Sequence, residues 1–133
     1  MRDWAGFLEL ARKLAATEGS ATERNAELRS ALSRAYYSAF QDARKYVAEK
    51  DFRFAIRKND PNPPTHAAIW NWFSDKPGRV GQLTNLGLGF RRKRNQADYE
   101  VYSTMDNLKY EVGDAIRKAE AILRLLAQAR EAS

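Results

Sequence analysis

The chain has 133 residues, a formal net charge of +6 at pH 7, no cysteine and one histidine, His66. Its length predicts a single domain with its own core, and the lack of cysteine excludes a disulfide scaffold, a cysteine-ligated metal and a thiol nucleophile. With a single histidine and no cysteine, we expect neither a metal nor another cofactor. No apolar run reaches the length of a membrane span, and the first residues lack a signal-peptide pattern, so we expect a cytoplasmic domain with no membrane partner.

Apolar residues recur at helical spacing in three long segments. The first predicts a helix over residues 3–17, with Asp3 as its N-cap. The second predicts a long helix over residues 21–49, in which recurring alanines allow a neighbouring helix to approach closely. The third predicts a helix from about residue 104 to residue 130.

The middle of the chain is less regular. Residues 51–64 are predicted to form a proline-rich loop, because the segment from Asp60 to Pro64 cannot lie inside a helix. A short helix follows, capped by Thr65. Its three large aromatic residues occupy successive faces, so one packing surface cannot bury them all, and we expect them in the core or at a dimer interface rather than in base stacking. They are Trp70, Trp72 and Phe73.

A further helix is predicted over residues 79–98. Gly81, Gly87 and Gly89 each weaken it by about 1 kcal/mol relative to alanine, which indicates a very close packing partner or a kink. No segment shows strand-like alternation, and no internal repeat is present. The sequence therefore predicts an all-α fold, an antiparallel bundle of four main helices plus a short helix, with residues 1–133 as one domain.

Positive charge gathers in residues 51–100, which carry nine basic against five acidic side chains. Four of the nine are consecutive: Arg91, Arg92, Lys93 and Arg94. Such a run is typical of a phosphate-binding surface and equally of a solvated helix face. Arg94 falls on the apolar stripe, where a guanidinium needs a carboxylate or a protein cleft around it. Asp98 can reach it across one helical turn, so an ion pair that fixes the helix end is the simpler interpretation.

The segment from Arg94 to Tyr99 resembles the Arg-x-x-Ala-Asp-Tyr signature of one branch of the HEPN (higher eukaryotes and prokaryotes nucleotide-binding) domains. Two further segments support this resemblance. Residues 33–40 are similar to the Arg-Ala-Tyr-Tyr-x-x-Phe stretch of that family's long helix, and Thr65-His66 is similar to the segment after its central loop. The three segments cover roughly residues 28–126, in the family's order.

The resemblance implies a HEPN-like bundle that pairs as a homodimer, with Arg94 of both copies facing a shared cleft. It also implies RNA, a nucleotide or a nucleotidyltransferase-type protein as the partner, in a prokaryotic defence or toxin–antitoxin setting. The residues that it implies for phosphate or nucleic-acid binding are Arg91, Arg92, Lys93, Arg94, Arg34 and Tyr37.

An active metal-independent endoribonuclease is the alternative, with Arg94, Asp98 and Tyr99 as catalytic residues. HEPN ribonucleases carry histidine where this chain has Tyr99. An ordinary phenol, with a pKa of about 10, is ionised in roughly one molecule per thousand at pH 7, a handicap of about 4 kcal/mol relative to a group matched to that pH. We therefore favour a binding module over an enzyme. A non-catalytic helical adaptor, whose polar cleft only locks the dimer, is the third interpretation.

Two residues remain unassigned. His66 follows the proline-rich loop, where a lone histidine is more often a surface or capping residue than a base. Tyr102 is a candidate acceptor for adenylate from a partner enzyme, although it does not match the position that the resemblance implies.

Overall fold

The computed structural model describes residues 4–16, 21–51, 54, 66–99 and 105–132. Every regular element within these ranges is helical, which confirms the predicted all-α class. The elements are α1 (Trp4–Ala16), α2 (Ala21–Lys50), α4 (His66–Asn71), the 3₁₀ helix η1 (Gly78–Gln82), α5 (Leu83–Tyr99) and α6 (Met105–Ala132). The proline-rich loop lies almost wholly outside the described residues.

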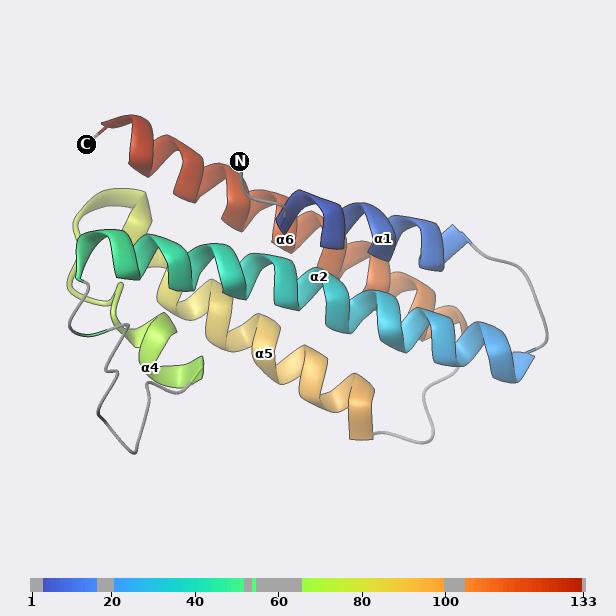
Figure 1. Ribbon diagram of the computed structural model, residues 1–133. Helices are drawn as coiled ribbons and strands as arrows, with labels where there is room; N and C mark the ends of the chain where they lie inside the picture. Colours follow the sequence, from blue (N-terminus) through green and yellow to red (C-terminus); the bar gives the residue numbers. More distant parts are fainter. Residues whose placement is uncertain (1–3, 17–20, 52–53, 55–65, 100–104, 133) are drawn as a thin grey trace.

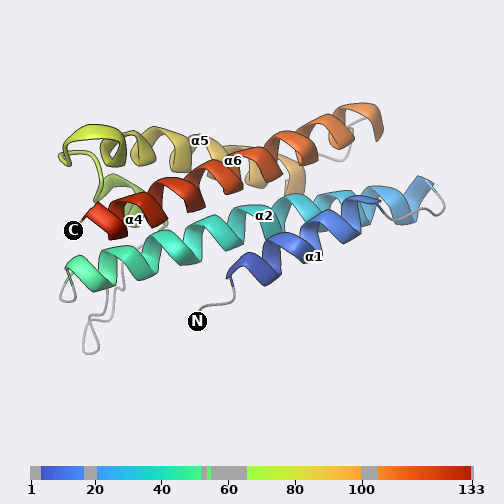
Figure 2. The ribbon, with the colours of Figure 1, turned by 90° about the horizontal axis from the view of Figure 1, so that it is seen from above.

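The 30-residue helix α2 is the centre of the bundle. At 1.5 Å per residue it is about 45 Å long, and it contacts each of the other α-helices named above. Helices α1 and α5 run antiparallel to α2, whereas α6 runs in the same direction as α2 and antiparallel to α5 (Figures 1 and 2). The structure is therefore an all-helical bundle with one short helix, but it departs from a fully antiparallel arrangement because α2 and α6 run in the same direction. None of the described helices is both long and apolar enough to cross a membrane.

The core follows the predicted stripes. On α2 the buried apolar side chains recur every three or four residues, and the alanines among them are completely buried, as close helix packing requires. The buried apolar residues of the two longest helices are Leu28, Ala31, Leu32, Ala35, Tyr36, Ala39, Phe40, Ala43, Tyr46 and Val47 on α2, and Val112, Ala115, Ala119, Ile122 and Leu126 on α6.

The three aromatic residues at α4 all serve the core or its rim. Trp70 and Phe73 are completely buried. Trp72 is half-buried, and its indole Nε1 donates to Asp51 Oδ2 at 3.2 Å while Lys76 Nζ lies 4.2 Å from its ring. The prediction that these residues serve packing is therefore confirmed within this chain.

The start of α5 differs from the prediction. The sequence pattern places it at residue 79, whereas residues 78–82 form η1 and α5 begins at Leu83. Gly78 has a φ of +70°, a conformation that favours glycine. A Cβ on Gly81 would lie 2.5 Å from the carbonyl oxygen of Lys76. Both glycines thus serve a tight turn, and only Gly87 and Gly89 of the three predicted helix glycines belong to α5.

Helix α4 is fixed against α5 at Gly87. A Cβ on Gly87 would overlap the indole ring of Trp70. Beside this contact, the Thr84 hydroxyl donates to the Trp70 carbonyl oxygen at 2.7 Å, and the bond is buried. The predicted close packing partner is therefore found at Gly87, whereas a Cβ on Gly89 would meet only the tip of Arg92, at 3.9 Å.

Arg130 of α6 links α6 to the C-terminal half of α2. Its Nη2 lies 3.1 Å from Asp42 Oδ1 and 3.1 Å from Glu49 Oε1, and its guanidinium lies over the Tyr46 ring at 5.6 Å. The Asp42 side chain is only 5% exposed, so this is a largely buried charge pair. Near its C-terminus, α6 is therefore held to α2 by charged side chains.

The contact between Gly87 and Trp70 predicts opposite effects for two alanine substitutions in one helix. Gly87→Ala is expected to lower the free energy of unfolding by about 1–3 kcal/mol, because the new methyl group must displace the indole ring. Gly89→Ala is the matched control and is expected to raise the free energy by up to about 1 kcal/mol, because alanine favours helix and meets no obstacle there. Urea denaturation measures both, and equal effects would contradict the packing described here.

Candidate functional site

Tyr36 lies where α2, α4 and α5 meet, and the candidate site is built around it. Its side chain is 1% exposed and its ring packs edge-to-face against Phe90 of α5, with centroids 5.2 Å apart. Phe40, one turn further along α2, is 5% exposed. The predicted core role of both α2 aromatics is therefore confirmed, and together they form an apolar floor.

A chain of hydrogen bonds crosses this floor. The Trp70 Nε1–H donates to the Tyr36 hydroxyl oxygen at 3.0 Å, and that hydroxyl lies 2.8 Å from His66 Nδ1. Because an indole nitrogen can only donate, the Tyr36 oxygen is the acceptor from Trp70, and its own proton is available for Nδ1. His66 Nδ1 is then an acceptor, so the neutral imidazole carries its proton on Nε2.

The His66 ring is also held by stacking. It lies parallel to the Phe40 ring, with a centroid distance of 3.8 Å and an angle of 4°, and it is half-buried. Burial lowers the pKa of His66 below its ordinary 6.5, and the positive charges of Arg91, Arg94 and Arg44 lower it further. The imidazole is therefore neutral at pH 7. His66 is thus partly a surface residue, as expected, but its ring is also held by Tyr36 and Phe40 of α2, which the local sequence did not indicate.

Arg94 is half-buried beside Tyr36, on the apolar stripe where the sequence places it. Its Nε donates to the Ser33 hydroxyl of α2 at 3.3 Å, and its guanidinium carbon lies 5.9 Å from the centre of the Tyr36 ring. Partners within the chain thus account for its position, and a cleft between two copies is not needed to explain it. The side chains of Asp98 and Tyr99 lie outside the described residues, as does Tyr102, so their predicted roles stay predictions.

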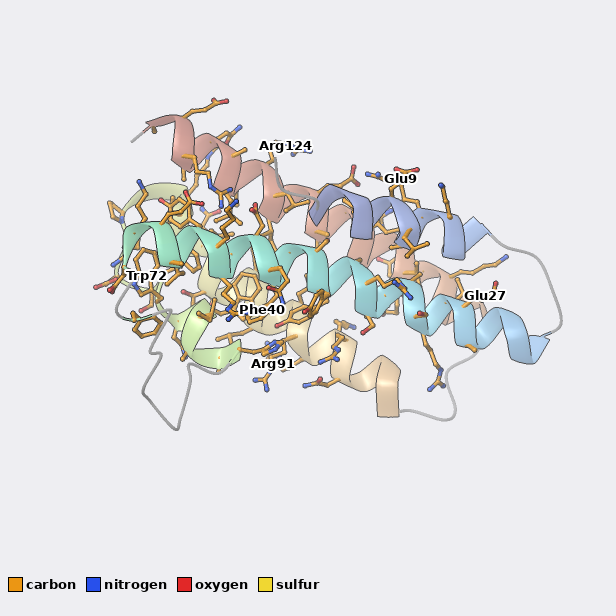
Figure 3. All side chains as sticks on the ribbon, viewed as in Figure 1. Glu9, Glu27, Phe40, Trp72, Arg91 and Arg124 are labelled. Atoms are coloured by element: carbon orange, nitrogen blue, oxygen red, sulfur yellow. The ribbon has the colours of Figure 1, made fainter. Side chains whose placement is uncertain are left out.

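The basic run does not act as one patch. Arg91 and Arg94 are three residues apart on α5 and therefore share a face, and both bear on the pKa of His66 and of Tyr36. In the view of Figure 3, Arg91 is labelled beside the end of α4. Lys93 instead points toward α6, where its Nζ lies 3.3 Å from Glu111 Oε1, and Arg92 is exposed. Of the four predicted phosphate contacts in this run, the structure brings Arg91 and Arg94 to the site.

Two further predicted binding residues lie on α2. Arg34 is half-buried and its Nε donates to the Ser30 hydroxyl at 3.4 Å, whereas Tyr37 is 43% exposed. Sequence reasoning missed Ser33 and Arg44, which belong to the same side of α2. Ser33 precedes Phe40 by seven residues and Arg44 follows it by four, so the helical period could have placed both on the side of α2 that carries Phe40.

The electrostatic character of the site favours an anion. The charges that shift the pKa of His66 are all cationic, and burial raises the pKa of the Tyr36 phenol, so neither group supplies a negative charge at pH 7. Over the described residues, no group of three or more metal-ligating side chains could hold a metal ion. A ligand for this site should therefore bring negative charge and hydrogen-bond acceptors.

Comparison of the chain with protein-family models, curated proteins and solved structures found no match.

The lowered pKa of His66 predicts a pH-dependent contribution to stability. The unfolded chain, with a histidine pKa near 6.5, takes up protons more readily than the folded chain, so stability is highest above pH 6.5 and falls as the pH drops through 6.5 toward the folded pKa. His66→Gln removes this contribution. Between pH 7.5 and pH 5 the wild-type melting temperature should therefore fall more steeply than that of His66→Gln, and parallel slopes would contradict the pKa assignment.

Proposed function

We propose that this protein is a HEPN-like module that binds RNA through phosphate groups at the site formed by Arg91, Arg94 and His66. The observation that carries the proposal is the position of Arg94, whose guanidinium lies 5.9 Å from the centre of the buried Tyr36 ring, with Arg91 on the same face of α5 and His66 hydrogen-bonded to Tyr36. The charges of both arginines lower the pKa of His66. Arginine is the side chain best suited to phosphate, because its planar fork of donors matches two phosphate oxygens. The resemblance of residues 94–99 and 33–40 to HEPN segments supports the same ligand class.

The local charge balance also supports an anionic ligand. Three arginines bear on the His66 imidazole, and their mutual repulsion is relieved when a negative group enters between them. The surrounding apolar floor of Tyr36 and Phe40 lowers the local dielectric and strengthens such an attraction. A net charge of +6 adds a long-range attraction for a polyanion such as RNA.

Binding is favoured over cleavage by the protonation states at the site. Cleavage through a 2′-hydroxyl needs a nearby group that accepts a proton around pH 7. His66 has its accepting nitrogen occupied by Tyr36 and presents Nε2–H, and the Tyr36 phenol has a raised pKa. Among the described side chains of the site, neither group is therefore suited to act as a general base. The endoribonuclease alternative with Asp98 and Tyr99, the homodimer and the nucleotidyltransferase partner stay predictions from the resemblance.

Two double variants of equal net charge test the site. Arg91→Ala/Arg94→Ala should weaken binding of a fluorescein-labelled single-stranded RNA by roughly tenfold or more, because two charged contacts are lost. It should also reduce the salt dependence of log K by about 1.4, the contribution of two phosphates on a single strand. Fluorescence anisotropy at several salt concentrations gives both quantities.

The control is Arg117→Ala/Arg124→Ala on α6, where both side chains are exposed. Figure 3 shows Arg124 on the opposite side of the bundle from Arg91. This control should change affinity by less than about twofold. Equal losses in the two variants would mean that binding follows net charge alone, and no loss in the first would refute the site.

A second assay separates the module from an enzyme. Structured and single-stranded RNA incubated with the pure protein in EDTA should stay intact on a denaturing gel, because neither His66 nor Tyr36 can accept a proton in the arrangement described. RNA cleavage that disappears in Arg94→Ala would contradict the proposal and support the metal-independent endoribonuclease.

A further inference from the structure

We infer that His66 is a ligand-binding residue that presents a fixed Nε2–H donor to a phosphoryl oxygen, in the tautomer set by Trp70 and Tyr36. The inference rests on the phosphate binding proposed above and adds an uncharged donor to the two arginines of the same site. It also assigns a role to the chain's one histidine that differs from acid–base catalysis.

The directions of the hydrogen bonds around Tyr36 determine which nitrogen of His66 carries the proton. If His66 carried a proton on Nδ1, that proton would point at the Tyr36 oxygen, which already receives the Trp70 Nε1–H. The Tyr36 hydroxyl proton would then need another acceptor, and the described residues offer it none. Tyr36 is 1% exposed, so water cannot readily serve instead. The buried Trp70 therefore keeps the His66 proton on Nε2.

The orientation of the His66 ring determines the direction in which Nε2 faces. The ring plane is fixed by the parallel stack on Phe40 and its rotation by the bond at Nδ1. Nε2 is separated from Nδ1 by one ring carbon, so it lies on the edge of the imidazole away from the Tyr36 hydroxyl. No described residue makes a hydrogen bond with Nε2, and the side chain is half-exposed. We place the external ligand at this N–H.

The charges around the imidazole are positive. From α2 it is faced by Arg44 and by the protonated phenol of Tyr36, and from α5 by Arg91 and Arg94. A phosphoryl group that enters here meets three cations together with one neutral donor. A neutral imidazole adds a hydrogen bond without adding a fourth like charge, whereas an imidazolium would increase the repulsion in the unliganded site.

The test uses the fact that the chain has a single histidine. In ¹⁵N-labelled protein without a histidine tag, long-range ¹H–¹⁵N spectra then show one imidazole. The spectrum of the unliganded protein at pH 7 should be that of the neutral Nε2–H tautomer. Tyr36→Phe should mix the two tautomers, whereas Tyr110→Phe, at an exposed position on α6, should leave the pattern unchanged. This spectroscopic readout separates a positioning role of Tyr36 from a merely structural one.

Ligand binding is then followed on the same signals. The probes are decauridylate with a 5′-phosphate, decauridylate with a 5′-hydroxyl, and uridine 5′-monophosphate. Binding should shift the Nε2–H signal and raise the pKa of His66, because a negative charge now lies beside it. A shift with both oligonucleotides assigns the phosphoryl group to internal phosphodiesters, and a shift only with the two 5′-phosphorylated probes assigns it to a terminal phosphate.

Two substitutions of His66 complete the test. The amide nitrogen of His66→Gln can reach the position of Nε2, so this variant should bind the oligonucleotide nearly as well as the wild type. The amide nitrogen of His66→Asn takes the position of Nδ1 instead, so this variant should bind the oligonucleotide about fivefold more weakly. If neither variant folds, the spectra of the wild type decide alone.

The possible failures can be told apart. Binding that requires Arg91 and Arg94 but leaves the imidazole signals unmoved, or the Nδ1–H tautomer in the unliganded wild type, would overturn the role of His66 and leave the proposed function standing. No binding of any probe by the wild type would overturn both.

Discussion

The packing of Trp70 against the backbone of Gly87 is the constraint on which the site depends. Helix α4 has six residues, too few to be stable alone, and this contact holds it between α2 and α5. The buried indole then supplies the N–H that orients the Tyr36 hydroxyl, and the hydroxyl in turn decides which nitrogen of His66 is protonated. A packing contact between two helices thus sets the position of one proton at the surface.

The electrostatics of the site follow from helix geometry. Residues three apart on α5 share a face, so Arg91 and Arg94 meet the imidazole while Lys93 turns to Glu111 on α6. Burial against Phe40 and the charges of the arginines both disfavour an imidazolium, so two independent effects keep His66 neutral. The result is a cationic surface whose one titratable ring acts as a hydrogen-bond donor.

The fold could be predicted from the sequence because its long helices carry clear apolar periodicity. The three glycines of residues 79–98 indicated a close packing partner, which the structure shows at Gly87. Periodicity could not separate η1 from α5, since a 3₁₀ turn continues the pattern for a few residues. Nor could it reveal the role of His66, whose partner Tyr36 lies 30 residues away and whose surroundings depend on how α4 docks. The pairing of Lys93 with Glu111 was missed for the same reason, because local spacing does not report contacts between helices.

The charge cluster of Arg130, Asp42 and Glu49 has a consequence for how the chain can be altered. Arg130 lies in the last turn of α6, where a helix usually frays and where tags are commonly attached or residues removed. Here the last turn supplies a cation to Asp42, which lies in the C-terminal half of α2 and whose side chain is only 5% exposed. A truncation before residue 130 therefore removes part of the interior rather than a loose end, and by leaving Asp42 without that cation it costs about 3–5 kcal/mol.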